Sequence, residues 1–565
     1  MQQDRWTNQT IRNMTQVVDG NKVPTLVLKN ATYLNTYLKR WDHANIWLVD
    51  DRIVYVGERL PESTEIEIVD CQPYVLVPGY IEPHSHPFML TNPVHYSAFA
   101  AKHGTTTMIH DNLPLFLQLE NEQAFQFIEK MNKLPYSAYW WARLDGQSAF
   151  KEEPFKDPKV SQWIQHPKVV QVGELTGWPQ LMQGDEQILS WIQEARHLSK
   201  KVEGHFPGAS EKTLTKLALL GAEGDHEAMN AEEILRRLNL GYMVTMRESS
   251  IRPDLREIIR GLQQEKITRF DRFMVTLDGA HPYFHAEGLT DHLIKIMIEE
   301  GIPLEDAYLI ASYNAAVYYE LEALHGSIAV GRIANINFLS AKDQPTPVAV
   351  LAQGKWVDLA PEAPVDFDWE ASPFQKRQLD WTLSEVDLEF EGQLGIELVN
   401  NVITKSYERA GDLLEGEAYL ALFDQNGSWR VNSFVKNFVS DLGGLASSYS
   451  GTDDILLLGQ NKPDMQLAFQ RMREIGGGIV VVDKGRILYE LSLPLNGHMS
   501  TLPMEKLIEE NQRLQDLLAA RGYAFADAVF TILFFTATHL PFVRITPQGI
   551  VEVKSSQVIQ PSIER

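Results

Sequence analysis

The residues best suited to chemistry in this chain are histidines, and they are concentrated in one stretch. Twelve of the 16 histidines fall between His84 and His292, where an even spread over 565 residues would place about six. The first two form the pattern His84-Ser85-His86. Residues at i and i+2 of a strand project from the same face, so both imidazoles could bind one metal ion. An isolated His-x-His is more often incidental, so the pattern needs partners elsewhere in the chain.

Four further side chains could supply those partners. Glu174, His205, His226 and Asp278 each stand at the end of a short β-rich run. Taken singly, each has an ordinary interpretation as a helix cap, a turn former or a hydrogen-bonded histidine. Taken together, several histidines with carboxylates suit Zn²⁺, Mn²⁺ or Fe²⁺. Two such ions would lower the pKa of a shared water and generate hydroxide, whose proton Asp278 could accept. The combination predicts a metal-dependent hydrolase.

The segments that must position these residues alternate between strands and helices. The candidate strands are 80–84, 105–111, 136–142, 169–174, 202–206, 222–226, 241–248 and 272–278. Amphipathic stretches with helical spacing separate most of them. Eight βα units in about 250 residues are typical of a (β/α)₈ barrel, although an open doubly wound sheet repeats the same units. In a barrel, the carboxyl ends of the strands form the active-site face, where most of the candidate residues would lie.

The predicted barrel interrupts a smaller β domain. Alternating apolar and polar residues predict short strands in 24–77, and a similar pattern returns at 327–357. The predicted fold is α/β: a TIM-like barrel inserted in a small β-sandwich, followed by a C-terminal α+β domain. We expect an N-terminal segment with the first half of the small domain at 1–77 and the metal-binding barrel at 78–325. The second half of the small domain and a linker would follow at 326–385, and the C-terminal domain at 386–565.

Composition excludes several classes of protein. The 51 Lys and Arg against 75 Asp and Glu give a net charge of −24, which argues against nucleic-acid or anionic-membrane partners. The single cysteine, Cys71, permits no internal disulfide or thiolate cluster. Residues 1–14 lack the apolar core of a signal peptide, and 528–538 is too short to span a bilayer. We expect a cytoplasmic protein, with 528–538 in the core rather than at a subunit interface.

Longer motifs resemble the amidohydrolase superfamily and, within it, the adenine deaminase family. VPGYIEPHSH resembles the first-strand motif, KKVEGHFPGASEKTL the Gly-His-Ala-Pro-Gly segment, and GAEGDHEAMNAEE the Ser-Asp-His-Glu segment. MVTMRESS resembles a Met-x-Arg-Glu-Gly-Ser segment, while 434–448 and 491–500 resemble the C-terminal domain of the narrower family. Related hydantoinases and dihydroorotases commonly use a carboxylated lysine where this chain has Glu174. The nearby Lys168 stands at the wrong end of the strand.

The resemblance implies a binuclear metal site that deaminates a small molecule. His84 and His86 would bind the first ion, and His205 and His226 would bind the second. Glu174 would bind both ions. Asp278 would lie beside the hydroxide, so the predicted catalytic residues are Asp278 and His226. Attack of hydroxide on C6 of adenine and loss of ammonia would give hypoxanthine. The family suggests Mn²⁺ or Fe²⁺, with Zn²⁺ as an alternative, and by analogy the chain could form a homo-oligomer.

Three stretches depart from the family. An Asp-Pro-His-Glu motif, whose Glu is a proposed acid/base group, reads 111–114 Asp-Asn-Leu-Pro. An Ile-Glu-Ser-Ser-Met-Leu stretch reads 87–90 Pro-Phe-Met-Leu, and a His-Asp-x-His-Asn run reads 451–454 Gly-Thr-Asp-Asp. Loss of a proton donor to the substrate ring would typically cost ~10²-fold or more in rate. The candidate replacements and further pocket residues are His110, Asp111, Glu248, His281 and Glu287.

Three functions therefore stay open. The first is hydrolytic deamination of adenine. The second keeps the metal site but changes the substrate to another purine, a pterin-like ring or a cyclic amide, as the altered loops would allow. The third is a non-enzymatic binding role, against which the six intact ligand positions weigh.

Overall fold

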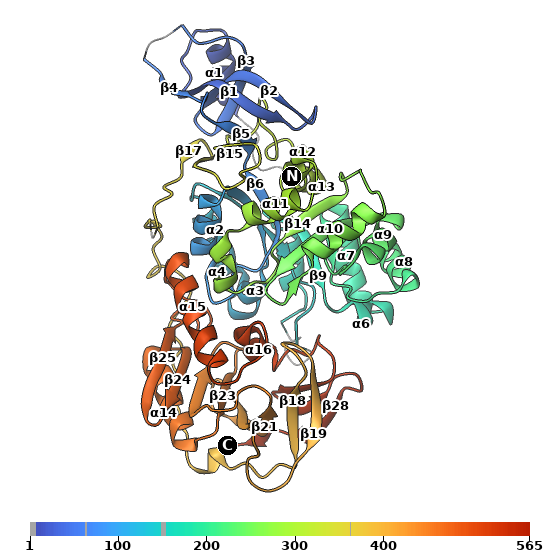
Figure 1. Cartoon of the computed structure of the whole chain (residues 1–565), viewed down its shortest axis with the longest axis vertical. Helices are drawn as coiled ribbons and strands as arrows, with labels where there is room; N and C mark the ends of the chain where they lie inside the picture. Colours follow the sequence, from blue (N-terminus) through green and yellow to red (C-terminus); the bar gives the residue numbers. More distant parts are fainter. Residues whose placement is uncertain (1–6, 63–64, 149–153, 362) are drawn as a thin grey trace.

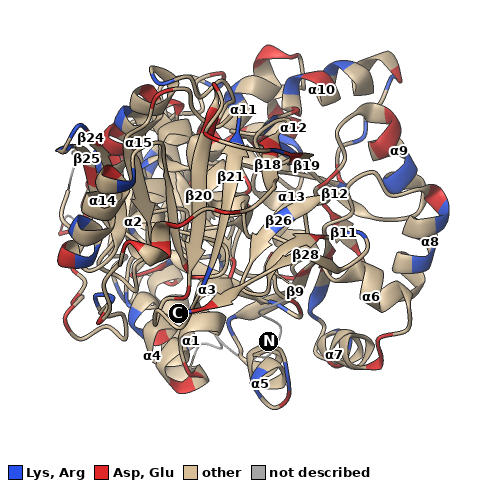
Figure 2. Ribbon diagram, turned by 90° about the horizontal axis from the view of Figure 1, so that it is seen from below, with Lys and Arg blue, Asp and Glu red and all other residues tan. Residues whose placement is uncertain are grey.

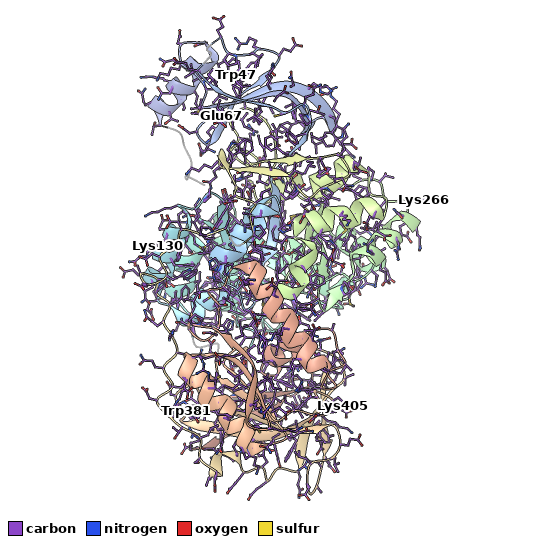
Figure 3. All side chains as sticks on the ribbon, turned by 60° about the vertical axis from the view of Figure 1, so that its left-hand side comes forward. Trp47, Glu67, Lys130, Lys266, Trp381 and Lys405 are labelled. Carbon is purple, nitrogen blue, oxygen red and sulfur yellow. The ribbon has the colours of Figure 1, made fainter. Side chains whose placement is uncertain are left out.

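The computed structural model describes residues 7–62, 65–148, 154–361 and 363–565, so residues 1–6 of the polar N-terminal stretch lie outside it. The chain forms three parts stacked along one axis: a small β domain, a central barrel and a C-terminal domain (Figure 1). In Figure 3, the labelled side chains Trp47 and Glu67 mark the small β domain, Lys130 and Lys266 the barrel, and Trp381 and Lys405 the C-terminal domain.

The barrel has eight parallel strands, which confirms the predicted fold class. They are β6 (Tyr80–Ser85), β7 (Thr105–His110), β8 (Ser137–Ala142), β9 (Val169–Leu175), β10 (Lys201–Gly204), β11 (Gly224–Asp225), β12 (Met243–Ser249) and β14 (Phe273–Thr276). Each pairs with the next, β14 pairing with β12. A parallel bridge between Ser85 and Asp278 joins the last strand to the first. The ring is thus closed, and its closure places the residues around His84 beside Asp278.

Helices cover the outside of the barrel (Figure 1). The main ones are α2 (Pro93–Lys102), α4 (Asn121–Met131), α5 (Lys159–Gln165), α7 (Glu186–His197), α8 (Glu211–Leu219), α9 (Ala231–Asn239), α10 (Leu255–Gln264), α11 (Thr290–Glu299), α12 (Leu304–Ile310) and α13 (Tyr313–Tyr318). In α7, Asp185 caps the first turn, and the buried residues Ile188, Trp191, Ile192 and Ala195 follow helical spacing. Acidic and basic residues are interspersed along α8, α9 and α10 (Figure 2).

One sheet of the small domain unites strands from both sides of the barrel. Before the barrel come β1 (Leu26–Asn35), β2 (Arg40–Val49), β3 (Arg52–Gly57), β4 (Glu67–Asp70) and β5 (Val75–Pro78); after it come β15 (Ile336–Leu339), β16 (Ala349–Ala352) and β17 (Lys355–Trp356). Strand β5 joins the halves, since it pairs with β1 on one side and with β15 on the other. A 2.7 Å hydrogen bond joins Thr36 to Ser327, 291 positions later. Helix α1 (Asn8–Val18), which the sequence pattern did not indicate, packs against this domain.

The C-terminal domain has a large mixed sheet with helices on it. Its strands are β18 (Leu394–Leu398), β19 (Thr404–Glu408), β20 (Glu417–Phe423), β21 (Trp429–Lys436), β22 (Gly444–Ser447), β23 (Ile455–Gly459), β24 (Gly478–Asp483), β25 (Arg486–Ser492) and β29 (Ile563–Glu564). Strands β26 (Val543–Thr546), β27 (Gly549–Glu552) and β28 (Gln557–Pro561) form a second sheet. The helices are α14 (Lys462–Ile475), α15 (Met504–Ala519) and α16 (Ala528–Phe534).

Helix α16 accounts for the apolar run at 528–538. Six of its seven residues are buried, so this helix lies in the core, as expected. The described residues between β17 and the short helix η2 (Val386–Leu388) form no helix or strand and connect the small domain to the C-terminal domain (Figure 1). Within the described part of the chain, no helix combines the length and apolarity needed to cross a membrane.

The C-terminal domain contacts the barrel at the end where the ligand candidates lie. Asp527, the N-cap of α16, accepts a 2.9 Å hydrogen bond from Ser250 and lies 3.0 Å from His281. Gln118 Nε2 donates to Asp453 Oδ1 at 3.0 Å. Polar contacts of this kind hold the two parts together, and the C-terminal domain thereby covers the active-site face of the barrel.

Candidate metal centre

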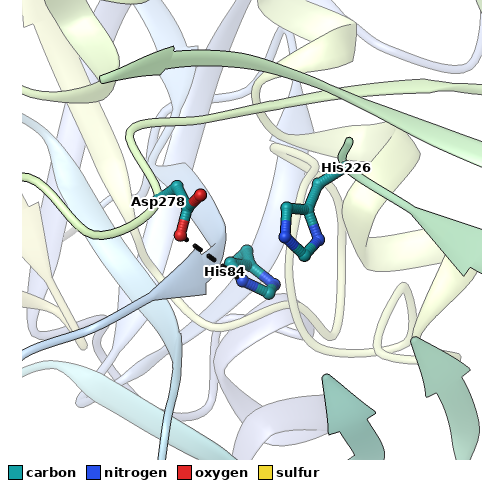
Figure 4. Close-up of side chains that lie close together, drawn as sticks. All are labelled: His84, His226 and Asp278. Carbon is teal, nitrogen blue, oxygen red and sulfur yellow. Dashed lines mark ion pairs between the residues drawn. The ribbon is translucent and has the colours of Figure 1, made fainter. Parts of the chain in front are cut away.

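Six side chains converge at the carboxyl ends of the barrel strands. They lie on or directly after β6, β9, β10, β11 and β14. Their potential ligand atoms form three overlapping groups, each within 4.8 Å: His84 with His226 and Asp278, His84 with His86 and Glu174, and Glu174 with His205 and His226. Figure 4 shows the first group, in which His84 lies between the other two side chains. The structure thus brings together the six residues that the sequence indicates as ligands.

Glu174 lies at the centre of this group. Its Oε2 atom is 3.4 Å from His84 Nε2, 3.3 Å from His205 Nδ1 and 3.2 Å from His226 Nε2. Its Oε1 atom is 2.9 Å from Arg143 Nη2. A carboxylate oxygen that faces histidines from three strands is placed where one ligand could serve two cations.

Asp278 follows β14 in a left-handed backbone conformation, with φ of 54°. Its Oδ1 atom is 3.0 Å from His86 Nε2 and 3.7 Å from His84 Nε2, the pair joined by a dashed line in Figure 4. Its Oδ2 atom is 2.6 Å from Arg247 Nη1. Burial alone would raise the pKa of Asp278, but Arg247 and the histidines hold that pKa well below its usual range. The carboxylate is therefore ionised.

His84 provides the test of whether this site fits a metal ion. Both of its ring nitrogens are buried and have no hydrogen-bond partner among the described residues. Burial, reinforced by the neighbouring His226, lowers the pKa of His84 to about 4, so the imidazole is neutral. Burying imidazole nitrogens without a hydrogen-bond partner costs free energy, and the nitrogen of a neutral imidazole binds a divalent cation well. The donor set fits a divalent metal.

Two buried arginines beside the site were not assigned roles from the sequence. Arg143 follows β8 and pairs with Asp111 at 2.7 Å and with Glu174 at 2.9 Å. Arg247 lies on β12 and pairs with both Glu227 and Asp278 at 2.6 Å. Each guanidinium keeps its carboxylates charged and fixed. Arg247 stands within the MVTMRESS motif, which could have indicated it, whereas nothing in the local pattern marks Arg143.

The predicted substrate-side residues have different surroundings. Asp111 lines the cavity, but its carboxylate is held by Arg143 and by His86 Nδ1 at 3.0 Å. His110 is buried between the hydroxyls of Ser85 and Ser97. The other three do not line the cavity: Glu248 accepts a hydrogen bond from the Leu255 amide, His281 bonds Asp527 and Tyr449, and Glu287 is exposed at the end of helix η1 (Pro282–Glu287).

Two carboxylates face candidate ligand histidines from behind. Asp111 faces His86 Nδ1, and Glu203 Oε1 lies 3.4 Å from His226 Nδ1. Hydrogen bonding of the second imidazole nitrogen to a carboxylate fixes the tautomer and ring orientation of a ligand histidine. The sequence pattern did not indicate Glu203, because it lies two residues before His205 inside a buried strand.

Replacing Glu203 by Ala is expected to weaken metal binding by about 10- to 100-fold, because His226 would lose the acceptor that orients it. Competition with a chelator of known affinity measures the change. The control is Glu223→Ala, which removes a carboxylate directly before the neighbouring strand β11 and should leave metal affinity unchanged. Equal affinities of the two variants would contradict an orienting role for Glu203.

A fully buried ion pair fixes the loops that carry His205 and His226. Asp225 accepts hydrogen bonds from the amides of Phe206 and Glu227, the residues that follow the two histidines. Arg237 pairs with Asp225 and also donates to the Phe206 carbonyl at 2.9 Å. Both charged side chains are wholly inaccessible to solvent.

Arg237→Met is expected to lower the free energy of unfolding by about 3–5 kcal/mol, because it leaves the Asp225 carboxylate buried without its cation. Urea unfolding measures the loss. The adjacent Arg236→Met removes a guanidinium that pairs with the exposed Glu232, and should cost less than about 1 kcal/mol. Comparable losses of unfolding free energy in the two variants would show that the buried ion pair stabilises the fold no more than the exposed one.

One cavity connects the metal-ligand cluster to the C-terminal domain. Its volume is about 120 Å³, which suits a small molecule. Glu174, His205 and Asp278 line it from the barrel. Apolar side chains from both parts form its walls: Phe88, Met89, Leu113, Leu117, Ile251, Phe530, Leu533 and Phe534. The C-terminal domain adds polar groups, namely Tyr449, Asp453, His498 and His539.

Comparison with known proteins agrees with this arrangement. Residues 75–359 match the amidohydrolase family, and residues 396–557 match the adenine deaminase C-terminal domain. A Bacillus cereus protein that carries a provisional adenine deaminase name is 50% identical over 574 residues, covering 99% of this chain and 97% of that protein. This chain belongs to the adenine deaminase family. A Kosmotoga olearia adenine deaminase is 27% identical over 576 residues, covering 97% of this chain and 98% of its own length.

The two family matches divide the cavity between them. All six candidate ligand residues lie in the amidohydrolase part, whereas the part that matches the adenine deaminase C-terminal domain contains Tyr449, Asp453, His498 and His539. The C-terminal domain of this family member therefore forms one wall of the cavity that contains the ligand cluster.

Proposed function

We propose that the protein is a metal-dependent adenine deaminase, which converts adenine and water to hypoxanthine and ammonia. The observation that carries this proposal is the convergence of five candidate metal ligands on a sixth, Glu174, beside a cavity closed by the C-terminal domain. The family membership supports the substrate, because relatives covering nearly the whole chain carry that name. A cavity of small-molecule size with apolar walls suits a neutral heterocycle.

The ligand set supports two divalent ions. His84 with His86 would hold one ion, His205 with His226 the other, and Glu174 would bind both. We propose Mn²⁺ or Fe²⁺, with Zn²⁺ as the alternative, since imidazole and carboxylate donors suit all three. Ions bound there would activate a water molecule as a nucleophile at neutral pH.

Asp278 would manage the protons of the reaction. Its carboxylate takes a proton as the water oxygen bonds to C6 of adenine, and it returns a proton to the amino group as the bond from C6 to that nitrogen breaks. Ammonia leaves with that proton, the oxygen stays on C6, and the second proton of the water ends on N1 of hypoxanthine. Arg247, at 2.6 Å, holds Asp278 in place and keeps it ionised before attack.

The proposal is tested with purified, Mn²⁺-loaded protein and adenine. We expect loss of adenine absorbance together with release of one ammonia per adenine, and identification of the product as hypoxanthine. No turnover at full metal occupancy would overturn adenine as the substrate.

A second candidate keeps the metal site and changes the ring. Both oxygens of the Asp111 carboxylate accept hydrogen bonds from Arg143, so Asp111 is poorly placed to give a proton to a ring nitrogen of adenine. A related purine, a pterin-like ring or a cyclic amide that needs no such donor would suit this loop. A screen of these compounds with the same metal-loaded protein separates the two candidates.

A further inference from the structure

A second polar cluster lines the cavity, and it comes mainly from the C-terminal domain. It consists of Asp453 in the loop after β22, His498 after β25, and Gln118 from the barrel helix α3 (Leu113–Gln118). Among the described residues, no hydrogen bond or ion pair joins these three to the six ligand residues. The proposed chemistry makes no use of this cluster.

The cluster presents polar atoms that lack partners. The contacts of the Asp453 carboxylate go to Oδ1, from Gln118 Nε2 at 3.0 Å, His498 Nδ1 at 3.6 Å and Arg377 Nη2 at 3.8 Å. Within the described structure, Asp453 Oδ2 has no such contact. His498 is 9% exposed, and its Nδ1 atom is buried without a hydrogen-bond partner. An unpaired buried polar atom such as His498 Nδ1 costs free energy, and the Asp453 side chain beside it is partly exposed. Both atoms are therefore suited to pair with a ligand.

The loop that carries Asp453 is held in place. Asp453 has φ of 61°, a conformation that costs free energy for a residue other than glycine. The Arg377 guanidinium donates to the Asp453 carbonyl oxygen and to the Asn496 carbonyl, two residues before His498. One arginine thus ties together the two segments that carry the pair, and the centroid of the Tyr449 ring lies 4.6 Å from that of the His498 ring, with the two planes tilted by 48°.

We propose that Asp453 and His498 recognise the edge of a free purine base that carries N3 and N9–H, an assignment that rests on the proposed function. In adenine, N3 lies opposite C6 across the six-membered ring. When C6 faces the metal ligands, the N3 and N9–H edge faces away from them. Asp453 Oδ2 accepts the N9 proton, and His498 Nδ1 donates to N3. The apolar walls, which include Leu533 and Phe534, cover the faces of the ring.

This pairing excludes nucleosides. A ribose at N9 removes the proton that Asp453 accepts and places a bulky group against its carboxylate. A bound nucleoside would shield the Asp453 carboxylate from water without offering it a donor, and an acceptor left unpaired in this way lowers affinity. The C-terminal domain would therefore select free bases over nucleosides.

The experiment compares adenine, 9-methyladenine and 3-deazaadenine as substrates of the full-length, metal-loaded enzyme. Wild type is expected to prefer adenine in kcat/KM by at least about 10- to 100-fold over each analogue, the value of a hydrogen bond to a charged or buried partner. In Asp453→Ala, KM for adenine rises and the preference over 9-methyladenine falls below about threefold. In His498→Phe, the preference over 3-deazaadenine falls in the same way. Asp441→Ala, an exposed carboxylate in the same domain, is the control.

The outcomes separate this assignment from the proposed function. Turnover of adenine with undiminished preferences in both variants overturns the recognition role alone. Failure of the metal-loaded wild type to convert adenine overturns the proposed function. Calorimetric binding of hypoxanthine and 9-methylhypoxanthine provides a readout independent of turnover, and Asp453→Asn repeats it if the alanine variant is poorly folded. If an Asp453 variant binds hypoxanthine and 9-methylhypoxanthine with equal affinity, the assignment is supported. If it discriminates between them as wild type does, the assignment is overturned.

Discussion

Asp278→Asn is expected to lower kcat for deamination by about 10²- to 10⁴-fold while the protein keeps its metal. The amide has the shape of the carboxylate but cannot accept the proton of the attacking water, so this loss falls on the chemical step. KM should change little, because Asp278 acts on the water and on the leaving amino group. Steady-state kinetics with elemental analysis of the same sample measures both quantities.

The control for this variant lies at the other end of the same strand. Asp271 precedes β14 and pairs with the exposed Arg269, so Asp271→Asn changes one charge without reaching the cavity. Its kcat should equal that of wild type. Deamination by metal-replete Asp278→Asn within about threefold of wild type would refute the proton-transfer role. Loss of metal in that variant would instead assign Asp278 a role as an essential ligand.

Glu174→Gln is expected to abolish activity through loss of metal. The amide is neutral, so it cannot bring negative charge to both cations, and the transition-state stabilisation of several kcal/mol that they supply is lost. A fall in kcat of at least about 10³-fold corresponds to that energy. Metal content measured after gel filtration should fall below that of wild type, and excess Mn²⁺ should restore little activity.

The fold of this variant should survive, because Arg143 retains Asp111 as its partner when Glu174 becomes neutral. Thermal unfolding of the metal-free proteins tests that point, since wild type and variant should then differ little. A Glu174→Gln protein that keeps wild-type metal content and turnover would show that the carboxylate does not bind both ions.

The convergence of the candidate ligands could be predicted because each of them is marked locally. His84, Glu174, His205, His226 and Asp278 stand at or next to strand ends, and the strand pattern repeats eight times, so the barrel rule converts sequence position into spatial proximity. The fold class was predictable for a related reason, because the buried parallel strands of a barrel appear in the sequence as short apolar runs between amphipathic helices.

What could not be predicted depends on contacts between distant segments. Arg143 and Glu203 show no periodicity or motif of their own, and their roles follow only from the side chains that the barrel places beside them. The same holds for the run at 528–538, whose apolar residues gave no sign that Phe530, Leu533 and Phe534 would line a cavity. Asp111 was indicated as a pocket residue, but its pairing with Arg143 required the structure.

The small sheet has a consequence for synthesis of the chain on the ribosome. Strand β5 can gain its neighbour β15 only after about 260 further residues have been made, because the whole barrel intervenes. At about 5–20 residues per second, that interval is about 15–50 s. During this time β5 presents an unpaired edge, although its other neighbour β1 is already available, and the sheet has an incomplete apolar face. An exposed edge of this kind favours capture by chaperones or association with other nascent chains. The order of the sequence thus separates the synthesis of β5 from its final pairing.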